Sequence, residues 1–316
     1  MSNIMTFIEG YMTGNAWEEL CVKCYRLRYQ REYYTAIPAV QGGDAGIEGF
    51  TNRLVYQCYY PEGEYSDQQW YEKLRDKLTK DIGKFVNEEY AIKLKNLGVK
   101  NIREWHLVVP SYRDKRIIEH AKAKTDMVLE KKKENPELYS YISDDFEIRI
   151  KVAKDFTVEI SQLVRNFCLD IKLNTAIKDS DIDLSKCESV KVENIKRKVK
   201  AVMGKVEESD EHYIELVNTY IKFYMRGIEL MKIFSADFPE VYGDINELLL
   251  AYKKKVYSKT MFNSDKSLNA KIFNEILEEF GDRLEKEFKY LSFASVIELQ
   301  HDMVAGWLAD CSMEFR

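Results

Sequence analysis

The residues best placed to do chemistry lie in one short stretch of the chain, residues 41–59. The stretch reads Gln41-Gly-Gly-Asp44-Ala-Gly-Ile-Glu48-Gly-Phe50 and, after three further residues, Leu54-Val-Tyr-Gln57-Cys-Tyr59. Asp44 and Glu48 stand among glycines, and Gln57 stands at the centre of an apolar run that predicts a strand. Small glycines let a phosphate and its metal ion come close to the backbone.

These residue types suit the hydrolysis of a phosphodiester bond. Mg²⁺ prefers oxygen ligands, and a carboxylate on one strand and an amide oxygen on the next can share one ion. Such an ion activates a water molecule and stabilises the leaving oxygen. The segment therefore predicts a site for Mg²⁺ or Mn²⁺ built from Glu48 and Gln57, with Asp44 as a further acid.

Periodicity predicts the elements that must hold this segment in place. In the first half we expect helices over about 16–32, 66–86 and 114–133, and strands at 35–40, 46–51, 54–59, 105–109, 146–152 and 157–160. This order predicts a mixed sheet flanked by helices. In the second half we expect only helices, over about 190–207, 211–234, 243–258, 268–290 and 293–309.

Charge and chain breakers also divide the chain in two. Residues 1–165 hold 26 Lys and Arg against 26 Asp and Glu, whereas residues 166–316 hold 22 against 27, which gives the net charge of −5. Nine of the 14 glycines and four of the five prolines fall in the first part. The fold class expected is α+β or α/β, with a sheet domain over 1–175 and an all-α domain over 190–316. Neither part carries the positive surplus of a tight DNA binder.

The first part resembles the PD-(D/E)XK, or restriction-endonuclease-like, superfamily, in its variant with Gln in the third motif. That pattern is a helix with Glu, then Gly-x-x-Asp-Gly, then a strand with Gln-x-Lys. Here Glu18 matches the first acid, Glu48 matches the metal-binding Asp with one methylene added, and Gln57 matches the Gln. The resemblance covers about residues 10–165. It implies a restriction-endonuclease-like fold and divalent-metal-dependent cleavage, with Glu18, Glu48 and Gln57 as site residues.

Within that superfamily, the chain is most similar to effector nucleases of bacterial antiphage systems. The run Tyr56-Gln-Cys-Tyr-Tyr-Pro-Glu62, with Lys77, Asp81 and Lys84 downstream, resembles the nuclease subunits of ABC-three-component, Lamassu-type defence. This resemblance implies that the C-terminal half docks onto an SMC-like ABC ATPase subunit and a companion subunit. A shorter likeness near the C-terminus, at GWLADCSMEF, points the same way.

One departure from the family pattern concerns the lysine. Tyr59 occupies its place, and a neutral phenol cannot supply the cation that steadies an attacking hydroxide. Some nucleases of the superfamily carry this lysine on the following helix. Here four lysines share one face of the predicted helix, at i, i+4, i+7 and i+11, namely Lys73, Lys77, Lys80 and Lys84. We expect Lys77 to act, because Asp81 one turn on can orient it, and the other three to contact DNA.

Each candidate also has an ordinary structural explanation. Glu18 follows Asn15 by three residues, which is the spacing of a capping box. Asp44 can serve as a turn residue, and Gln57 can be a buried amide satisfied by the backbone. The lysines can form a solvated helix face. Glu48 has the weakest such explanation, since a charge beside a strand is costly to bury without a partner.

Other signals exclude functions rather than add them. The sequence has no Walker loop, no Gly-x-Ser-x-Gly elbow and no GxGxxG after a predicted strand, which disfavours an ATPase, an esterase and a dinucleotide enzyme. The Cys21-x-x-Cys24 pair lies inside a helical pattern without a second ligand pair, so we expect buried thiols rather than a zinc site. No membrane-spanning run and no secretory signal is present, which predicts a cytoplasmic protein.

The sequence therefore predicts a metal-dependent DNA endonuclease of low sequence specificity, held inactive by partner subunits until it is triggered and self-associates. Two alternatives stay open. One is a catalytically degenerate adaptor on the same fold, which Tyr59 favours. The other is an RNA-cleaving effector, because phosphate chemistry does not by itself specify the sugar.

Overall fold

The computed structural model describes residues 8–9, 12–37, 45–166, 172–174, 177 and 182–315. They divide into two compact units. The first unit holds the described residues from 12 to 166. The second holds those from 172 to 315 together with residues 8–9, because strand β1 (Ile8–Glu9) pairs antiparallel with β7 (Lys172–Leu173). These two short strands thus lie outside the sheet unit, although the predicted domain of residues 1–175 includes them.

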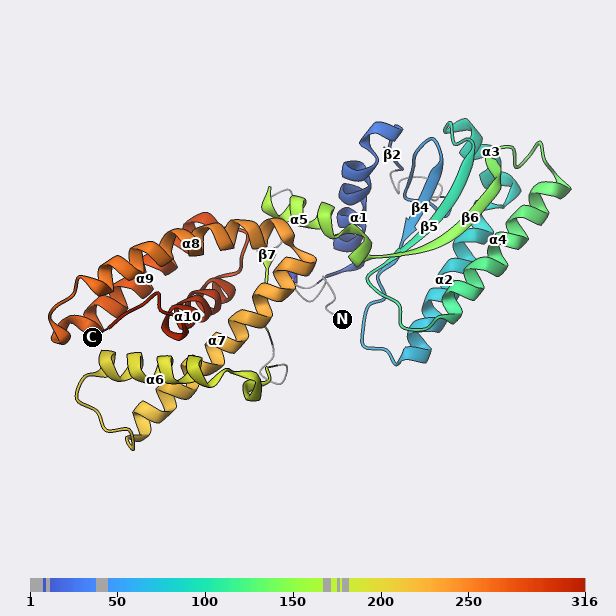
Figure 1. The fold of residues 1–316 in the computed structure, drawn as a ribbon. Helices are drawn as coiled ribbons and strands as arrows, with labels where there is room; N and C mark the ends of the chain where they lie inside the picture. The colour runs from blue at the N-terminus through green and yellow to red at the C-terminus, as the bar shows by residue number, and fades with distance from the viewer. Residues whose placement is uncertain are drawn as a thin grey trace. The chain divides into compact units, whose positions relative to one another are not determined.

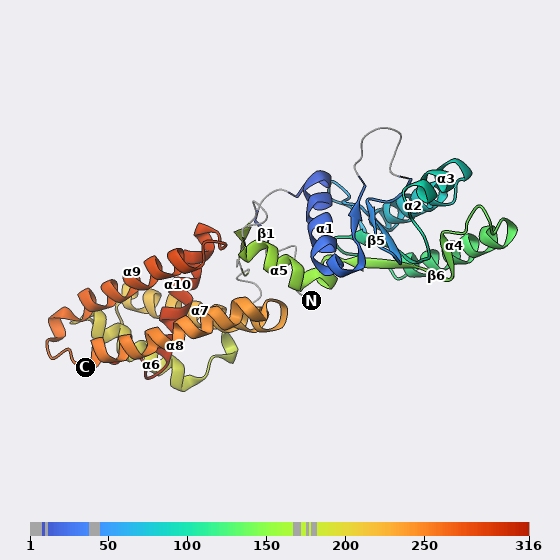
Figure 2. The same cartoon turned by 90° about the horizontal axis from the view of Figure 1, so that it is seen from above.

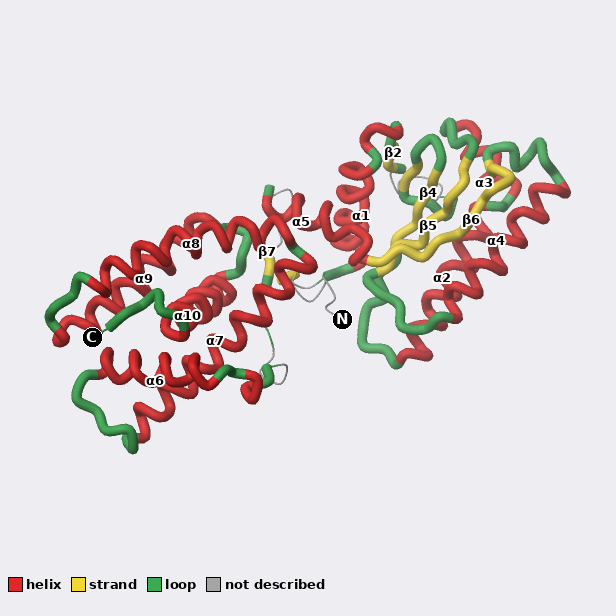
Figure 3. The backbone as a smooth tube through the Cα atoms, in the orientation of Figure 1, coloured by secondary structure: helices red, strands yellow, loops and turns green. Residues whose placement is uncertain are grey.

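The first unit is built on an open five-stranded mixed sheet (Figure 3). Its strands follow the order β2 (Thr35–Ala36), β3 (Gly49–Phe50), β4 (Leu54–Cys58), β5 (Ile102–Val109) and β6 (Ile142–Val152). The first three are antiparallel neighbours, whereas β4, β5 and β6 run parallel. A mixed sheet flanked by helices is therefore confirmed as the coarse architecture of this unit.

Helices cover both faces of this sheet (Figures 1 and 2). Helix α1 (Gly14–Arg28) lies on one face, where the ring of Tyr25 stacks on Tyr56 of β4 at 3.8 Å between centroids. Helices α2 (Asp67–Phe85) and α4 (Arg116–Glu134) lie on the other face and share its apolar core with Val55. Every residue of β4 is buried, as expected for a strand covered on both sides.

Several elements differ from those expected from the sequence, among them the short strands β1 and β7, which were not predicted. Residues 157–160, predicted as a strand, begin helix α5 (Thr157–Arg165). Their apolar and polar residues alternate over only four positions, whereas Ile160, Leu163 and Val164 are buried at helical spacing. Helix α3 (Glu88–Asn96) lies in a segment without a predicted element, and the Asn87 side chain caps its N-terminus.

The second unit is helical. It contains α6 (Ser189–Met203), α7 (Glu211–Asp237), α8 (Pro239–Met261), α9 (Asn269–Glu287) and α10 (Phe293–Ala309). Short 3₁₀ turns complete the described elements, at Gln30–Glu32, Ala153–Phe156, Leu184–Lys186 and Lys266–Leu268. Proline at the first position of α8 starts that helix four residues earlier than predicted, because its missing N–H is not needed there.

Helix α10 forms the centre of this bundle and contacts α6, α7 and α9. Most of its residues are buried, and the amino group of the fully buried Lys198 on α6 donates hydrogen bonds to the carbonyl oxygens of Trp307 and Asp310 at its C-terminal end. These bonds satisfy carbonyl groups that have no partner inside the helix. Among the described residues, no helix is long and apolar enough to cross a membrane.

Candidate active site

Glu48 and Gln57 come together where strand β3 begins beside β4. The backbone N–H of Glu48 donates to the carbonyl oxygen of Tyr56 at 2.7 Å, which sets the antiparallel register. The Gln57 Nε2 group then donates to Glu48 Oε1, also at 2.7 Å. Both side chains are buried, with exposed fractions of 7% for Glu48 and 2% for Gln57. The sequence placed these two residues in one site, and the structure brings them into contact.

The amide oxygen of Gln57 is a buried acceptor. It has no hydrogen-bond partner among the residues that the structure describes. A buried acceptor left unsatisfied costs about 1–3 kcal/mol, so such an atom in a native structure suggests a ligand. Because the same amide donates to Glu48, its oxygen and the carboxylate belong to one cluster of oxygen atoms.

A glycine turn carries Glu48 against helix α2. Gly46 adopts φ +78°, and a Cβ atom built on it would lie 2.3 Å from the carbonyl oxygen of Asp81. Only glycine combines this left-handed conformation with so close an approach. The turn at residues 45–46 therefore contacts α2 at Asp81. This contact lies only two residues along the chain from Glu48.

Asp81 is a further acid at this point of the unit. Its side chain is fully buried, and the Lys77 amino group lies 2.9 Å from its Oδ2 atom. The Lys84 amino group lies 3.9 Å from its Oδ1 atom. The sequence predicted that Asp81 orients Lys77, and this pairing is present. Its complete burial had no signal in the sequence, so Asp81 was not among the predicted site residues.

The predicted lysine stripe of α2 is divided by its contacts. Lys77 is half-buried, and its amino group lies 5.8 Å from the ring centroid of Tyr59, the residue in the family's lysine position. Burial raises the pKa of Tyr59, so this phenol stays neutral. Lys73 and Lys80 are exposed, and the Lys73 amino group lies 5.9 Å from the ring of Tyr65.

Glu18 lies on α1 and is half-buried. It makes no hydrogen bond or ion pair with any residue in the described part of the chain. The capping-box explanation for it is wrong, because the helix starts earlier: Thr13 is the N-cap and accepts from the N–H of Ala16. One turn after Glu18, Cys21 is buried, and its pKa is raised by burial first and by Cys58 and Glu48 in addition. Glu18 thus lies on the helix that covers the other face of the sheet from α2.

The predicted buried thiols are confirmed, since Cys21 and Cys24 are 3% and 2% exposed. Asp44, the remaining predicted acid, lies outside the described residues. No group of three or more His, Cys, Asp or Glu side chains is close enough to hold a metal ion within the described ranges. The oxygens of Glu48 and Gln57 fit a hard cation in kind, and they supply part of a ligand set.

A second polar cluster lies on the opposite face of the sheet, under α1. The Tyr25 hydroxyl is hydrogen-bonded to Nδ1 of the buried His106 at 2.7 Å, and the Nε2 atom of His106 lies 2.7 Å from Glu104. Burial lowers the pKa of His106, and the hydrogen bond to His106 lowers that of Glu104 to about 2. Since His106 is 1% exposed, this cluster joins α1 to β5 rather than meeting a substrate.

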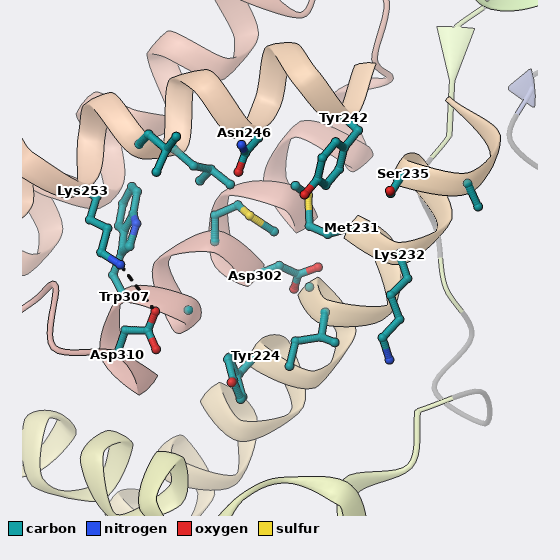
Figure 4. A pocket seen from close by; sticks show the side chains of 17 residues that line it. Tyr224, Met231, Lys232, Ser235, Tyr242, Asn246, Lys253, Asp302, Trp307 and Asp310 are labelled. Carbon is teal, nitrogen blue, oxygen red and sulfur yellow. Dashed lines mark ion pairs between the residues drawn. The ribbon is translucent and has the colours of Figure 1, made fainter. Parts of the chain in front are cut away.

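The helical unit contains a cavity of about 640 Å³ between α7, α8 and α10 (Figure 4). Its walls include Tyr242, Met231 and Trp307, and the buried carboxylate of Asp302. Asp302 accepts from Arg226 Nε at 2.9 and 3.0 Å, yet burial still raises its pKa to about 7. The cavity walls thus combine apolar side chains with polar ones, among them the Lys253–Asp310 ion pair at 3.8 Å (Figure 4), and the cavity belongs to the other unit from the Glu48 cluster.

Three comparisons with known proteins were made. The chain matches no family model, no curated protein and no solved structure. The nuclease interpretation therefore depends on the residues themselves: an acid and an amide in contact, a buried second acid, and a lysine between that acid and Tyr59.

Proposed function

We propose that the first unit is a divalent-metal-dependent endonuclease that hydrolyses phosphodiester bonds in DNA with low sequence specificity. The observation that carries the proposal is the buried contact between Glu48 and Gln57, in which the Gln57 amide oxygen has no partner among the described residues. Structural packing alone gives no reason to bury a carboxylate and an unsatisfied amide oxygen side by side. A cation would give the Gln57 amide oxygen a partner and would offset the buried charge of Glu48.

In this proposal Glu48, the amide oxygen of Gln57 and Asp44 hold Mg²⁺ or Mn²⁺. When bound, such an ion lowers the pKa of water and stabilises charge on the leaving oxygen. Glu18 orients the attacking water from α1. Lys77 takes the place of the missing family lysine, since its amino group lies close to Tyr59, and Asp81 holds that amino group in position. Lys73, Lys80 and Lys84 contact the DNA backbone.

We further propose that the helical unit restrains this activity. A nuclease of low specificity endangers its host, and a protein with a net charge of −5 is poorly suited to bind DNA alone. Residues 190–316 would bind an SMC-like ABC ATPase and a companion subunit, and release followed by self-association would bring sites together on DNA. The test is co-purification of the full chain with an SMC-like ATPase encoded beside its gene. If the two do not co-purify, this part of the proposal is wrong.

Plasmid cleavage with Mg²⁺ or Mn²⁺ tests the catalytic proposal. We expect Glu48→Gln to reduce cleavage to background, because the amide keeps the shape but loses the charge that holds the ion. Glu119→Gln, at an exposed position on α4, is the matched control and should cleave like wild type. Lys77→Ala should slow cleavage about 10²–10⁴-fold while metal binding persists. The series should include the assembled complex.

The non-catalytic adaptor remains the second candidate, because Tyr59 occupies the lysine position. Two results together would establish the adaptor in place of the nuclease. The protein would cleave under no condition, and Mn²⁺ would not raise its melting temperature in a way that depends on Glu48. Matched RNA and DNA substrates, run in the same assay, separate the RNA-cleaving alternative.

A further inference from the structure

Half-buried aromatic rings gather at the end of the sheet where the parallel strands β4 and β5 finish. They follow β4 or β5 directly, or lie at the start of α2, and comprise Tyr59, Tyr60, Tyr65, Trp70, Tyr71 and Tyr112. We call this set the aromatic edge. The loops that carry it leave the same end of the sheet, below it in Figure 1. Ligands of open sheets with parallel strands commonly bind beyond this end.

The rings of the aromatic edge are held in place from beneath. Tyr59, Trp70, Tyr71 and Tyr112 pack with one side against the core under α2 and α4. The Trp70 indole donates to the carbonyl oxygen of Ser111 at 3.0 Å, which ties the start of α2 to the loop after β5. Rings fixed in this way lose little conformational freedom when a flat ligand stacks on them.

Cations stand among these rings. The amino groups of Lys73 and Lys77 lie 5.9 and 5.8 Å from the rings of Tyr65 and Tyr59. The Arg116 guanidinium lies 4.3 Å from the ring of Tyr71. Alternation of aromatic faces with Lys and Arg is how proteins hold single-stranded nucleic acid, because bases stack on the rings and phosphates meet the cations.

The charge of the aromatic edge favours binding of single strands over duplex. Several of its cations are already paired, since Arg113 lies 2.9 Å from Asp67 and Arg75 lies 2.7 Å from Asp76. Duplex DNA is bound chiefly through phosphate contacts, which need a surplus of free positive charge. The bases of a duplex are also stacked on one another, so their faces cannot reach a protein ring. A charge-balanced surface rich in rings therefore favours unpaired bases.

We propose that the aromatic edge binds a single-stranded segment of nucleic acid and leads it to the Glu48–Gln57 cluster. The inference rests on the proposed function for its purpose, although the binding itself does not require cleavage. Lys77 belongs to both regions, because it contacts Asp81 and lies near Tyr59. The substrate would then be a DNA end, flap or gap, or an unpaired stretch of RNA, rather than an intact duplex.

Fluorescence anisotropy without divalent metal tests the binding, with a labelled single-stranded oligonucleotide, the duplex of the same sequence and the matching RNA. We expect the full chain to bind the single strand at least about tenfold more tightly than the duplex. Tyr65→Leu should weaken single-strand binding about fivefold to a hundredfold, the value of one lost stacking contact. Tyr65→Phe keeps the ring and should bind nearly as wild type.

Tyr257→Leu, at an exposed tyrosine on α8 of the other unit, is the matched control and should leave binding unchanged. Equal affinity for duplex and single strand, or equal weakening by Tyr65→Leu and Tyr65→Phe, would overturn the inference. Glu48-dependent cleavage of duplex without single-strand preference would leave the proposed function standing and remove the inference alone. Single-strand binding that depends on the Tyr65 ring, without any cleavage, would support the inference and contradict the proposed function.

Discussion

Each unit of this protein contains a buried aspartate beside a cation, Asp81 in one and Asp302 in the other, and the two pairs are built differently. In the sheet unit, Asp81 faces the amino groups of Lys77 and Lys84, whose side chains are 22% and 30% exposed. In the helical unit, Asp302 faces the guanidinium of Arg226, which reaches it through Nε at 2.9 Å and Nη2 at 2.8 Å. Arg226 is itself buried.

The two pairs differ in whether the cation can move away from its aspartate. A lysine amino group is a point charge on a flexible stem, so Lys77 can turn toward water or a phosphate while Asp81 stays in place. The planar guanidinium of Arg226 is held in a two-pronged contact and is largely buried, with 11% of its side chain exposed. The sheet unit thus keeps a cation that is free to take part in chemistry, whereas the helical unit uses its cation to hold α7 against α10.

The largest effect should come from removing each aspartate charge in turn. Asp302→Asn turns an amide N–H toward the Arg226 guanidinium in place of an oxygen, while Glu298 stays 3.7 Å away as a counter-charge, so the helical unit should lose about 1–3 kcal/mol from the broken hydrogen bond. Asp81→Asn leaves two lysines that reach water, and should cost about 1 kcal/mol. Hydrogen exchange in the full chain reports each unit separately. Similar losses in the two units would remove the distinction drawn above.

A pair of glycines provides the next test. Gly46→Ala should destabilise the sheet unit by about 1–3 kcal/mol and lower metal affinity, because its Cβ would clash with the Asp81 carbonyl oxygen at positive φ. Gly306→Ala, on α10 beside the cavity, places its Cβ in open space and should stabilise the helical unit by about 0.5–1 kcal/mol.

Urea unfolding of the same two variants, with a Mn²⁺ titration, gives both values. An unchanged sheet unit in Gly46→Ala would show that the turn can move away from α2. The role of Gly46 in placing Glu48 would then be lost.

The smallest and most gradual effect should be a divergence of the two units with pH. The His106 pKa is lowered from 6.5 by burial, with Lys151 and Arg149 adding to the effect, so the sheet unit loses stability as pH falls below 6.5. Glu104, with a pKa of about 2 against 4.5, adds a further loss as pH falls from 4.5 toward 2.

Asp302 acts in the opposite sense. Its pKa is about 7 in the folded helical unit against an ordinary 3.8, so the folded state binds more protons between these values. The helical unit therefore gains stability as pH falls from 7 toward 4. Hydrogen exchange at about pH 7 and about pH 5, corrected for intrinsic rates, should show protection falling in β5 and rising in α10. A parallel change in both units would contradict the assignment.

Much of the framework was predictable because local patterns are strong where packing demands them. The apolar run around Gln57 is a strand, the long helices of the second half are present, and Cys21 and Cys24 are buried. The wrong element, at residues 157–160, is a four-residue alternation, which is too short to separate a strand from a helix. The capping explanation of Glu18 failed because several residue types can cap a helix, and Thr13, two residues before Asn15, is the N-cap.

The sequence by itself determined which residue types stand near one another along the chain: an acid among glycines, an amide in a strand, and a lysine one turn before an aspartate. Only the tertiary structure decided that Glu48 touches Gln57, that Asp81 is buried where Gly46 meets α2, and that rings from three segments reach one edge. The reason is physical. Spacing fixes the face of a strand or helix, whereas contact and burial arise from how separate elements pack together.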